Sequence, residues 1–246
     1  MKHLIIFSGS PASAVCAKKV SEKIDGLADD IELIYCQTYS EHIDTLRFIR
    51  QVSIYLDIPI RSLTSGKDLW AVIEEENRFP QGKENFCSKI LKHDVLNKFF
   101  DSLTLDRKIT IYFPFTIEDA AAAQKTAARM IERKIDFMAP LMLKGLNKKD
   151  CANIVENEWK IKLPYIYNLF DEVTCFPCVN KTCATYWQTI FKEYPIMFDK
   201  MSALETEIGN TIMPDISLEV LKKSIRKGKI ILQKGTQGAL PCDCGK

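Results

Sequence analysis

The sequence lacks the features that mark several specialised classes of protein. No apolar run approaches the roughly 20 residues that a membrane-spanning helix needs, so we expect no membrane span. The N-terminal stretch MKHLIIFSGS has too short an apolar core for a signal peptide, which makes a cytoplasmic location the expectation. The net charge is only +2, which gives no strong electrostatic case for a nucleic-acid partner, although a local basic patch is compatible with it.

Histidine is also scarce, whereas cysteine is not: the chain has 3 His and 9 Cys. Because disulfides are rare in the cytoplasm, we do not expect a disulfide framework, and clustered cysteines then point to metal or redox chemistry. A two-residue spacing between cysteines suits two corners of a tetrahedral metal site or of an iron–sulfur cluster. The clusters are Cys175-Phe-Pro-Cys178 with Cys183 close behind, and Cys242-Asp-Cys244 near the end.

The N-terminal residues have the pattern of a buried strand, a tight turn and a helix. Leu4–Phe7 is a short apolar run, typical of a central parallel strand. Ser8-Gly9-Ser10 interrupts it, and Pro11 suits the first position of a helix because its missing N–H would be unpaired there. We predict a helix over Ala12–Ile24. A helix that starts after a strand offers free N–H groups and the positive end of its dipole to an anion.

Strands and helices continue to alternate along the chain, which predicts a parallel sheet with right-handed crossovers. Ligands of such sheets bind at the carboxyl ends of the strands, so Ser8–Ser13 and Gln37–Ser40 are expected on the same rim. The further predicted strands are Ile31–Cys36, Ile58–Leu63, Lys108–Phe115 and Ile230–Gln233. The further predicted helices are His42–Leu56, Lys67–Glu76, the second half of Asn77–Phe100, Glu118–Arg133, Lys148–Glu158, Ala184–Phe191, Ser202–Gly209 and Leu218–Arg226.

Four stretches, kept in order along the chain, carry a resemblance to a known family. SGSPAS follows the first strand where the family has Ser-Gly-Gly-x-Asp-Ser. FCSKILK at Phe86–Lys92 is similar to Cys-[Ser/Thr]-[Arg/Lys]-x-Leu-Lys, and LPYIYNLF at Leu163–Phe170 to Pro-x-Leu-Tyr-x-x-Gly. The Cys-rich turn with the terminal CDCG is the fourth. The chain thus resembles the phosphoadenosine-phosphosulfate (PAPS) reductase-like branch of the PP-loop superfamily of adenine-nucleotide α-hydrolases, most closely the phage and DNA-phosphorothioation sulfurtransferase-like forms.

The resemblance implies an α/β fold with a parallel, Rossmann-like sheet of the HUP type. About five strands would be flanked by helices, with a C-terminal helical, Cys-bearing appendage. The implied domains are a nucleotide-binding α/β domain at 1–145 and a helical region with the Cys-rich turn and CxC tail at 146–246. The implied cofactor is an adenine nucleotide, either ATP or a PAPS-like compound. The residues that the resemblance assigns to it are Ser8, Gly9, Ser10, Ser13, Gln37, Thr38, Lys89 and Lys92, with a solvated helix face as the alternative for the two lysines.

The loop departs from the family pattern, which keeps two functions open. Ala12 replaces an Asp that helps position magnesium, a major stabiliser of phosphate charge. Pro11 lacks an N–H, and Ser10 brings a Cβ where close backbone approach favours Gly. The family also tends to have Glu-x-x-Arg after its fourth strand, whereas FTIEDAAAAQ has Glu118 and Asp119 with no Arg nearby. One hypothesis is a nucleotide-dependent sulfurtransferase or reductase, and the other is a degenerate module that binds a nucleotide or partner without turnover.

The cysteine pattern predicts one metal site with ligands from both clusters. We expect Cys175, Cys178, Cys242 and Cys244 in one coordination sphere, because two turns can supply two sulfurs each, with Cys183 as a substitute. The family resemblance adds Cys87 as a further candidate. Zinc, a [4Fe-4S] cluster and buried free thiols are the alternatives. The remaining cysteines, Cys16, Cys36 and Cys151, have apolar contexts and are expected in the core. Catalytic residues stay unassigned, and a protein or nucleic-acid substrate and a homodimer are the further partners considered.

Overall fold

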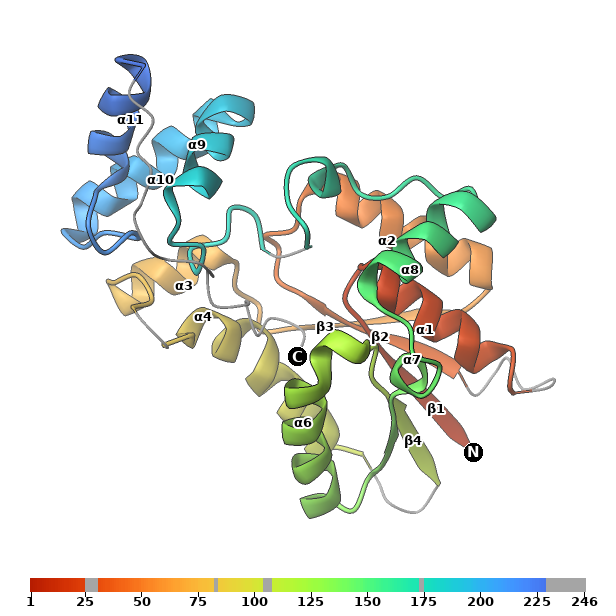
Figure 1. Ribbon diagram of the computed structural model, residues 1–246. Coiled ribbons are helices and arrows are strands. Elements are labelled where there is room, and N and C mark those ends of the chain that lie inside the picture. The colour runs from red at the N-terminus through yellow and green to blue at the C-terminus, as the bar shows by residue number, and fades with distance from the viewer. Residues whose placement is uncertain (25–30, 82–83, 104–107, 173–174, 229–246) are drawn as a thin grey trace.

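The protein is built on one parallel sheet (Figure 1). The computed structural model describes residues 1–24, 31–81, 84–103, 108–172 and 175–228. Its five-stranded sheet has the order β3-β2-β1-β4-β5, which is the doubly wound, Rossmann-like order. The strands are β1 (Lys2–Phe7), β2 (Ile31–Gln37), β3 (Ile60–Thr64), β4 (Ile109–Tyr112) and β5 (Asp136–Met138). The predicted fold class is therefore confirmed, including the central position of the first strand.

The central strand β1 is buried on both sides, which explains its continuous apolar sequence. Leu4 and Ile5 are fully buried on opposite faces. β1 pairs in parallel with β2, where Phe7 lies opposite Tyr35, and with β4, where Ile5 lies opposite Tyr112. Because both neighbours run parallel, the loops that follow β1, β2 and β4 emerge at one rim of the sheet.

Helices cover both faces of the sheet, and each face has its own apolar core. Ile5 and Phe7 pack against one group of helices, and Leu4 and Ile6 against the other. The first group is α1 (Pro11–Ser21), α2 (Ile43–Leu56), α7 (Pro140–Leu143), α8 (Lys148–Asn153) and the π-helical turn η4 (Ile154–Glu158). The second group is α5 (Asp94–Asp101) and α6 (Ala120–Glu132), the latter preceded by the 3-10 turn η3 (Ile117–Asp119).

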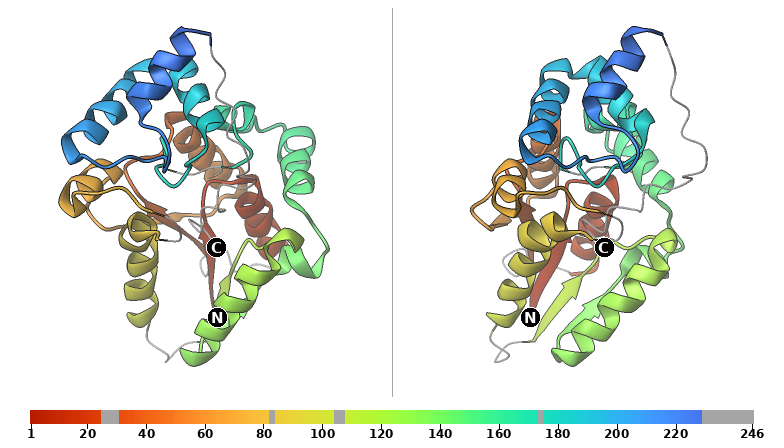
Figure 2. Two further views of the ribbon diagram at one scale, coloured as in Figure 1. Left: turned by 60° about the vertical axis from the view of Figure 1, so that its left-hand side comes forward. Right: turned by 90° about the vertical axis from the view of Figure 1, so that its left-hand side faces the viewer.

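A third apolar core joins helices that lie beyond the carboxyl ends of the strands (Figures 1 and 2). Trp187, Phe198 and Phe79 are fully buried in it. Its elements are α3 (Leu69–Glu76), α4 (Phe86–Ser88), the π-helical turn η2 (Lys89–His93), the 3-10 turn η5 (Tyr165–Asn168), α9 (Ala184–Glu193), α10 (Pro195–Ile208) and α11 (Leu218–Arg226). This core combines residues 69–91 with residues 166–221. The predicted division into domains 1–145 and 146–246 stays a proposal.

The elements differ from the predicted ones at several points; for example, α10 begins at Pro195, whereas the predicted helix began at Ser202, and α7 was not predicted. β5 was not predicted as a strand: its three residues are too few for a recognisable alternation, and we expected the segment to lead into a helix. β4 ends at Tyr112 and is shorter than predicted: the Phe113 amide still donates a hydrogen bond to the Met138 carbonyl of β5, but Phe113 and Phe115 lie beyond the strand and stack on each other. The predicted strand Ile230–Gln233 lies outside the described residues. None of the helices in the described part of the chain is long and apolar enough to cross a membrane.

Candidate active site

The loop after β1 is closed by its own serine side chains. Ser10 is the N-cap of α1, and its hydroxyl accepts a hydrogen bond from the Ser13 amide at 3.2 Å. In return, the Ser10 amide donates to the Ser13 hydroxyl at 3.1 Å, which completes a capping box. The Ser8 hydroxyl donates to the Ser10 hydroxyl at 3.0 Å, so the three hydroxyls form one chain. Within the described structure, the amides of Ser8, Gly9 and Ala12 are the loop amides left without an acceptor.

Gly9 is the position where the loop requires glycine. Its φ is +77°, and a Cβ there would come within 2.9 Å of Ile49 and 3.1 Å of Thr45, both on α2. Ser10, in place of the family's second glycine, has φ −93° and ψ 158°, which any residue adopts without strain. The second glycine is therefore not needed for the backbone conformation of this loop, and the serine contributes the helix cap.

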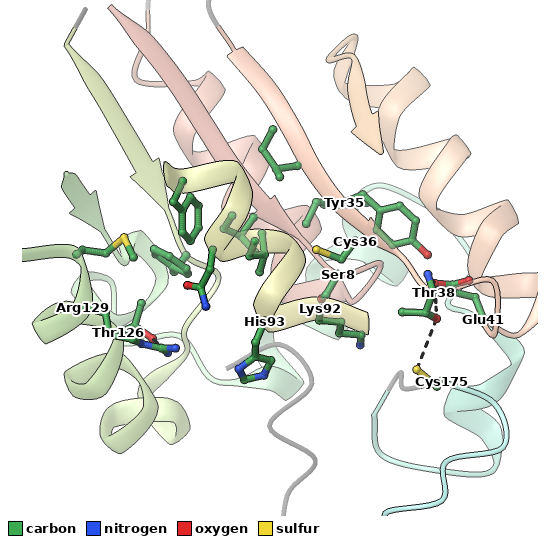
Figure 3. A pocket seen from close by; sticks show the side chains of 18 residues that line it. Ser8, Tyr35, Cys36, Thr38, Glu41, Lys92, His93, Thr126, Arg129 and Cys175 are labelled. Atoms are coloured by element: carbon green, nitrogen blue, oxygen red, sulfur yellow. Dashed lines mark hydrogen bonds between the residues drawn. The ribbon is translucent and has the colours of Figure 1, made fainter. Parts of the chain in front are cut away.

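A cavity opens beside this loop, between the carboxyl ends of β1, β2 and β4 and the helices α5 and α6 (Figure 3). Its floor is apolar, and its volume of about 90 Å³ is smaller than the roughly 150 Å³ of an engineered cavity that takes up benzene. The apolar lining is Ile6, Phe7, Ile34, Leu96, Phe100, Phe113 and Met130. The polar lining is Ser8, Tyr35, Cys36, Thr38, Glu41, Lys92, His93, Asn97, Thr126, Arg129 and Cys175.

The predicted nucleotide-binding residues fall into three groups. Ser8, Thr38 and Lys92 line the cavity. Gly9, Ser10 and Ser13 form the adjoining loop, and Gln37 ends β2, where it pairs with Thr64. Lys89 has its side chain 68% exposed and forms an ion pair with Asp94 on the outside of the helix. Of the two predicted lysines, Lys92 alone reaches the cavity.

A π-helical turn explains how neighbouring residues of one helix reach the same cavity. Lys92 and His93 both line it, although consecutive residues of an α-helix point about 100° apart. They belong to η2, which interrupts the helical run between α4 and α5 and widens it. Single π-helical turns inside helices are frequent at functional sites. The FCSKILK motif therefore contributes its lysine through a local irregularity that the sequence pattern did not predict.

Glu41 holds the rim at the end of β2. Its Oε1 accepts hydrogen bonds from the Thr38 amide at 2.7 Å and the Thr38 hydroxyl at 2.9 Å. Burial, followed by the neighbouring Glu41 carboxylate, raises the pKa of Tyr35 well above its ordinary value. A short antiparallel bridge then joins Glu41 to Cys175, and the Cys175 thiol lies 3.5 Å from the Thr38 hydroxyl. The rim after β2 is thus connected directly to the Cys-rich turn.

Arg129, His93 and Glu41 are cavity residues that the sequence analysis missed. The family's Arg was sought close to Glu118, and the structure instead brings Arg129 into the cavity from the third turn of α6. Glu118 and Asp119 have structural roles: Asp119 closes a capping box on Thr116, and Glu118 accepts a hydrogen bond from the Lys148 amide at the start of α8. A helical projection of α6 relative to β4 could have pointed to Arg129, but the sequence gives no separate signal for it.

Three cysteines line one small cavity next to Lys92. Cys87, Cys175 and Cys178 are all buried there, and Asn180 donates a hydrogen bond to the Cys87 sulfur at 3.4 Å. Cys183 is at the N-terminus of α9 and does not line this cavity. Across the described ranges, no three His, Cys, Asp or Glu side chains are arranged so that they could hold a metal ion. Because Cys242 and Cys244 lie outside those ranges, the four-thiolate site stays a prediction.

Burial raises the pKa of five of the described thiols, those of Cys16, Cys36, Cys87, Cys151 and Cys178. It raises the pKa of Cys87 to about 11 and of Cys178 to about 12, in both cases with a smaller contribution from Cys175. Cys36 was expected in the core, and that expectation is wrong: it is half-buried and lines the cavity. Burial raises its pKa to about 11, although the nearby Lys92 ammonium acts in the opposite direction. Cys16 and Cys151 are fully buried, as predicted.

The LPYIYNLF motif is connected to α2 by hydrogen bonds, and it thereby links the third core to that helix. The Asp44 carboxylate accepts a hydrogen bond from the Tyr165 amide at 2.7 Å, and Arg47 bridges Asp44 to the Leu163 carbonyl. His42, the N-cap of α2, forms a 2.8 Å hydrogen bond with the Tyr194 hydroxyl. The motif thus has a positioning role, since these contacts fix the helices beyond the strand ends next to the cavity.

Comparisons with known proteins give only distant similarities. No protein-family model matches the chain. An uncharacterized protein of Methanocaldococcus jannaschii is 25% identical over 203 residues, covering 79% of this chain and 45% of the relative, so the chain spans less than half the length of the curated relative it matches. Among solved structures, a predicted subunit of tRNA methyltransferase from Methanocaldococcus jannaschii has a TM-score of 0.41 and 15% identity, over 63% of this chain and 74% of that chain. An NH3-dependent NAD synthetase from Campylobacter jejuni, in complex with nitrate, has a TM-score of 0.41 and 10% identity, over 94% and 89% of the two chains.

Proposed function

We propose that this chain binds an adenine nucleotide in the manner of PP-loop proteins. The phosphates would lie against the loop Ser8–Ser13, and the base would lie on the apolar floor of the adjoining cavity. The observation that carries the proposal is the position of the loop. It follows the central strand, has three amides without an acceptor in the described structure, and shares Ser8 with the cavity.

The charge distribution supports an anionic ligand. The basic lining residues are Lys92, His93 and Arg129, against the single carboxylate of Glu41. The first turn of α1 contains no acidic residue, so nothing offsets the positive end of its dipole. A negatively charged group near Ser8 would thus be stabilised by the helix start and by the Lys92 ammonium.

The size of the cavity supports binding of part of the ligand only. A volume of about 90 Å³ is less than a benzene-binding cavity provides, so a purine would also occupy the open mouth. The apolar floor suits the faces of such a ring, and the polar rim suits its edge and the attached sugar. This arrangement leaves the phosphates outside the floor, on the side of the loop.

The loop chemistry supports binding without hydrolysis as the main activity. Ala12 offers no carboxylate for magnesium, and the capping box already uses the amides of Ser10 and Ser13. The finer assignment to a PAPS reductase-like enzyme or sulfurtransferase is supported by the thiols of Cys36 and Cys175 in the cavity. These thiols are not enough to assign a metal, and no step is derived through one.

Titration calorimetry tests the proposal, with ATP, AMP and phosphoadenosine phosphosulfate as ligands. We expect at least one of them to bind, and Ser8→Ala to weaken its affinity several-fold. Ser21→Ala is the matched control, because Ser21 ends the same helix away from the loop and donates only to the Lys18 carbonyl. Absence of binding by all three nucleotides at about millimolar concentration, in a folded protein, would leave the loop with a structural role only.

A further inference from the structure

The two ends of the cavity differ in chemistry. One end carries Thr38 and Glu41 from the segment after β2, and the other carries Arg129 and Thr126 from α6, with His93 from η2 in front (Figure 3). Ser8 lies between these ends, because β1 stands between β2 and β4 in the sheet. The Arg129 end is therefore separated from the loop that would bind the nucleotide phosphates.

Arg129 differs from the other described arginines in its surroundings. Its guanidinium is half-buried at a largely apolar cavity and donates only to the Thr126 hydroxyl, at 3.4 Å. No carboxylate of the described chain lies within ion-pair distance of it. Four other arginines each pair with a carboxylate, and the remaining two are exposed. The paired arginines are Arg47, Arg61, Arg78 and Arg133, and the exposed ones are Arg50 and Arg226.

A half-buried guanidinium without a counterion favours uptake of an anion. Removing a charge from water costs free energy unless a partner of opposite sign replaces the lost hydration. The only carboxylate among the described lining residues, Glu41, is at the other end, and its Oε1 is engaged by Thr38. The planar guanidinium matches an oxyanion with two parallel hydrogen bonds, a geometry that a lysine cannot provide.

The π-helical turn supplies the second side of the same site. It brings Lys92 and His93 together to the cavity: His93 lies on the side of Arg129, and Lys92 lies on the side of Ser8 and Cys36 (Figure 3). Asn97, one turn further along α5, adds an amide to the lining. Two elements distant in sequence thus converge on a space that contains no acidic side chain of the described chain.

We infer that the end of the cavity formed by Arg129, His93 and Asn97 is a second anion subsite, distinct from the Ser8–Ser13 loop. Its ligand is an oxyanion, a carboxylate, sulfate or phosphate group, carried by the molecule that enters the cavity together with the nucleotide. The inference deepens the proposed function by giving the chemical class of the second ligand. It rests on the proposed function only because both ligands would bind in the same cavity. Lys92 lies on the side of the loop, next to Ser8 and Cys36, whereas Arg129 belongs to the second subsite (Figure 3).

Nuclear magnetic resonance of the arginine Nε–H groups tests the subsite directly. The Arg129 resonance is assigned by its loss in Arg129→Gln, and the full chain is titrated with sodium sulfate, sodium phosphate and sodium acetate against sodium chloride at matched ionic strength. We expect the Arg129 signal to shift saturably with an oxyanion and not with chloride. Sulfate or phosphate in preference to acetate indicates a tetrahedral group, and the reverse indicates a carboxylate.

Variants separate this subsite from the loop and from general electrostatics. When the titration is followed through the backbone amide signals of His93 and Asn97, Arg129→Gln should weaken the apparent oxyanion affinity roughly tenfold or more. The affinity of Arg129→Lys should lie between that of Arg129→Gln and that of the wild type. Lys125→Gln removes the same charge from an exposed position of α6 and should change the affinity less than about twofold. Ser8→Ala should leave the Arg129 titration unchanged.

Two results would overturn the inference. One is an Arg129 signal that no oxyanion shifts saturably, and the other is a shift that disappears in Ser8→Ala, which would mean that the only anion site is the loop. Nucleotide binding with an unresponsive Arg129 would reject the subsite and keep the proposed function. A saturable Arg129 response in a protein that binds no nucleotide would keep the subsite and reject the proposed function.

Discussion

Ser10 and Ser13 hold each other in place at the start of α1: each hydroxyl accepts a hydrogen bond from the other's backbone amide, at 3.2 and 3.1 Å. The same two hydroxyls continue to Ser8, so the helix cap and the candidate phosphate loop are one structure. Stability of α1 and ligand binding by the loop are consequently coupled through these side chains.

Ser13→Ala should lower both stability and nucleotide affinity. It removes the N3 half of the capping box from a fully buried position, which we expect to lower the free energy of unfolding by roughly 0.5–2 kcal/mol, the range known for loss of the N-cap side chain. Urea denaturation gives the first quantity and ATP calorimetry the second. Ser21→Ala, at the other end of α1, should change neither by a comparable amount. An unchanged midpoint in Ser13→Ala would show that the capping box carries no net stability.

Gly9→Ala should be more damaging than the same substitution at another glycine of positive φ. Gly9 combines φ +77° with contacts of 2.9 Å from its missing Cβ to Ile49, whereas Gly209 has φ +72° and no atom within 4 Å. Both variants incur the left-handed backbone cost of roughly 1–2 kcal/mol, and Gly9→Ala adds an overpacking cost of about 1–3 kcal/mol. Equal losses of stability in the two variants would mean that α2 moves to accommodate the added Cβ without a loss of free energy.

Alkaline pH should destabilise the protein through its buried thiols. The pKa of Cys87 is about 11 in the folded chain, above the ordinary value of 9.0. Between these values the unfolded chain has released the proton and the folded chain has not. The contribution of this thiol to the free energy of unfolding is therefore fully present below pH 9. It is lost as the pH rises to 11, by on the order of 2 kcal/mol. Cys87→Ser should show a shallower fall than the wild type in chemical denaturation from pH 8 to 11, and an unchanged slope would contradict the assignment.

Local sequence patterns were sufficient for the framework of the fold. The apolar run Leu4–Phe7 and the Ser-Pro helix start predicted β1 and α1 because burial and capping act on neighbouring residues. Leu218–Arg226 was predicted with the bounds that α11 has, since Ser217 caps it and its apolar stripe is regular. The three-residue β5 was missed because its formation depends on pairing with β4, which a local pattern does not contain.

The candidate site was predictable where its residues belong to a motif or follow the carboxyl end of a predicted strand. Ser8 and Lys92 were found in the first way and Thr38 in the second, and all three line the cavity. Arg129 reaches it through the packing of α6 beside the sheet, and Cys36 through its place at the end of β2, so neither can be read from spacing alone. His93 depends on the π-helical turn, which hydrophobic periodicity does not reveal.

Nucleotide binding at the loop after β1 is tested most directly by a nuclear magnetic resonance titration of the ¹⁵N-labelled chain with ATP. Ser8, Gly9 and Ala12 carry the loop amides that lack an acceptor within the described structure, so their signals should shift first and saturate together with the nucleotide. Lining residues of the cavity floor should follow the same binding curve. If ATP binds while the Ser8, Gly9 and Ala12 signals stay in place, or if millimolar ATP shifts no signal of the loop or the cavity, the loop after β1 is not a nucleotide site.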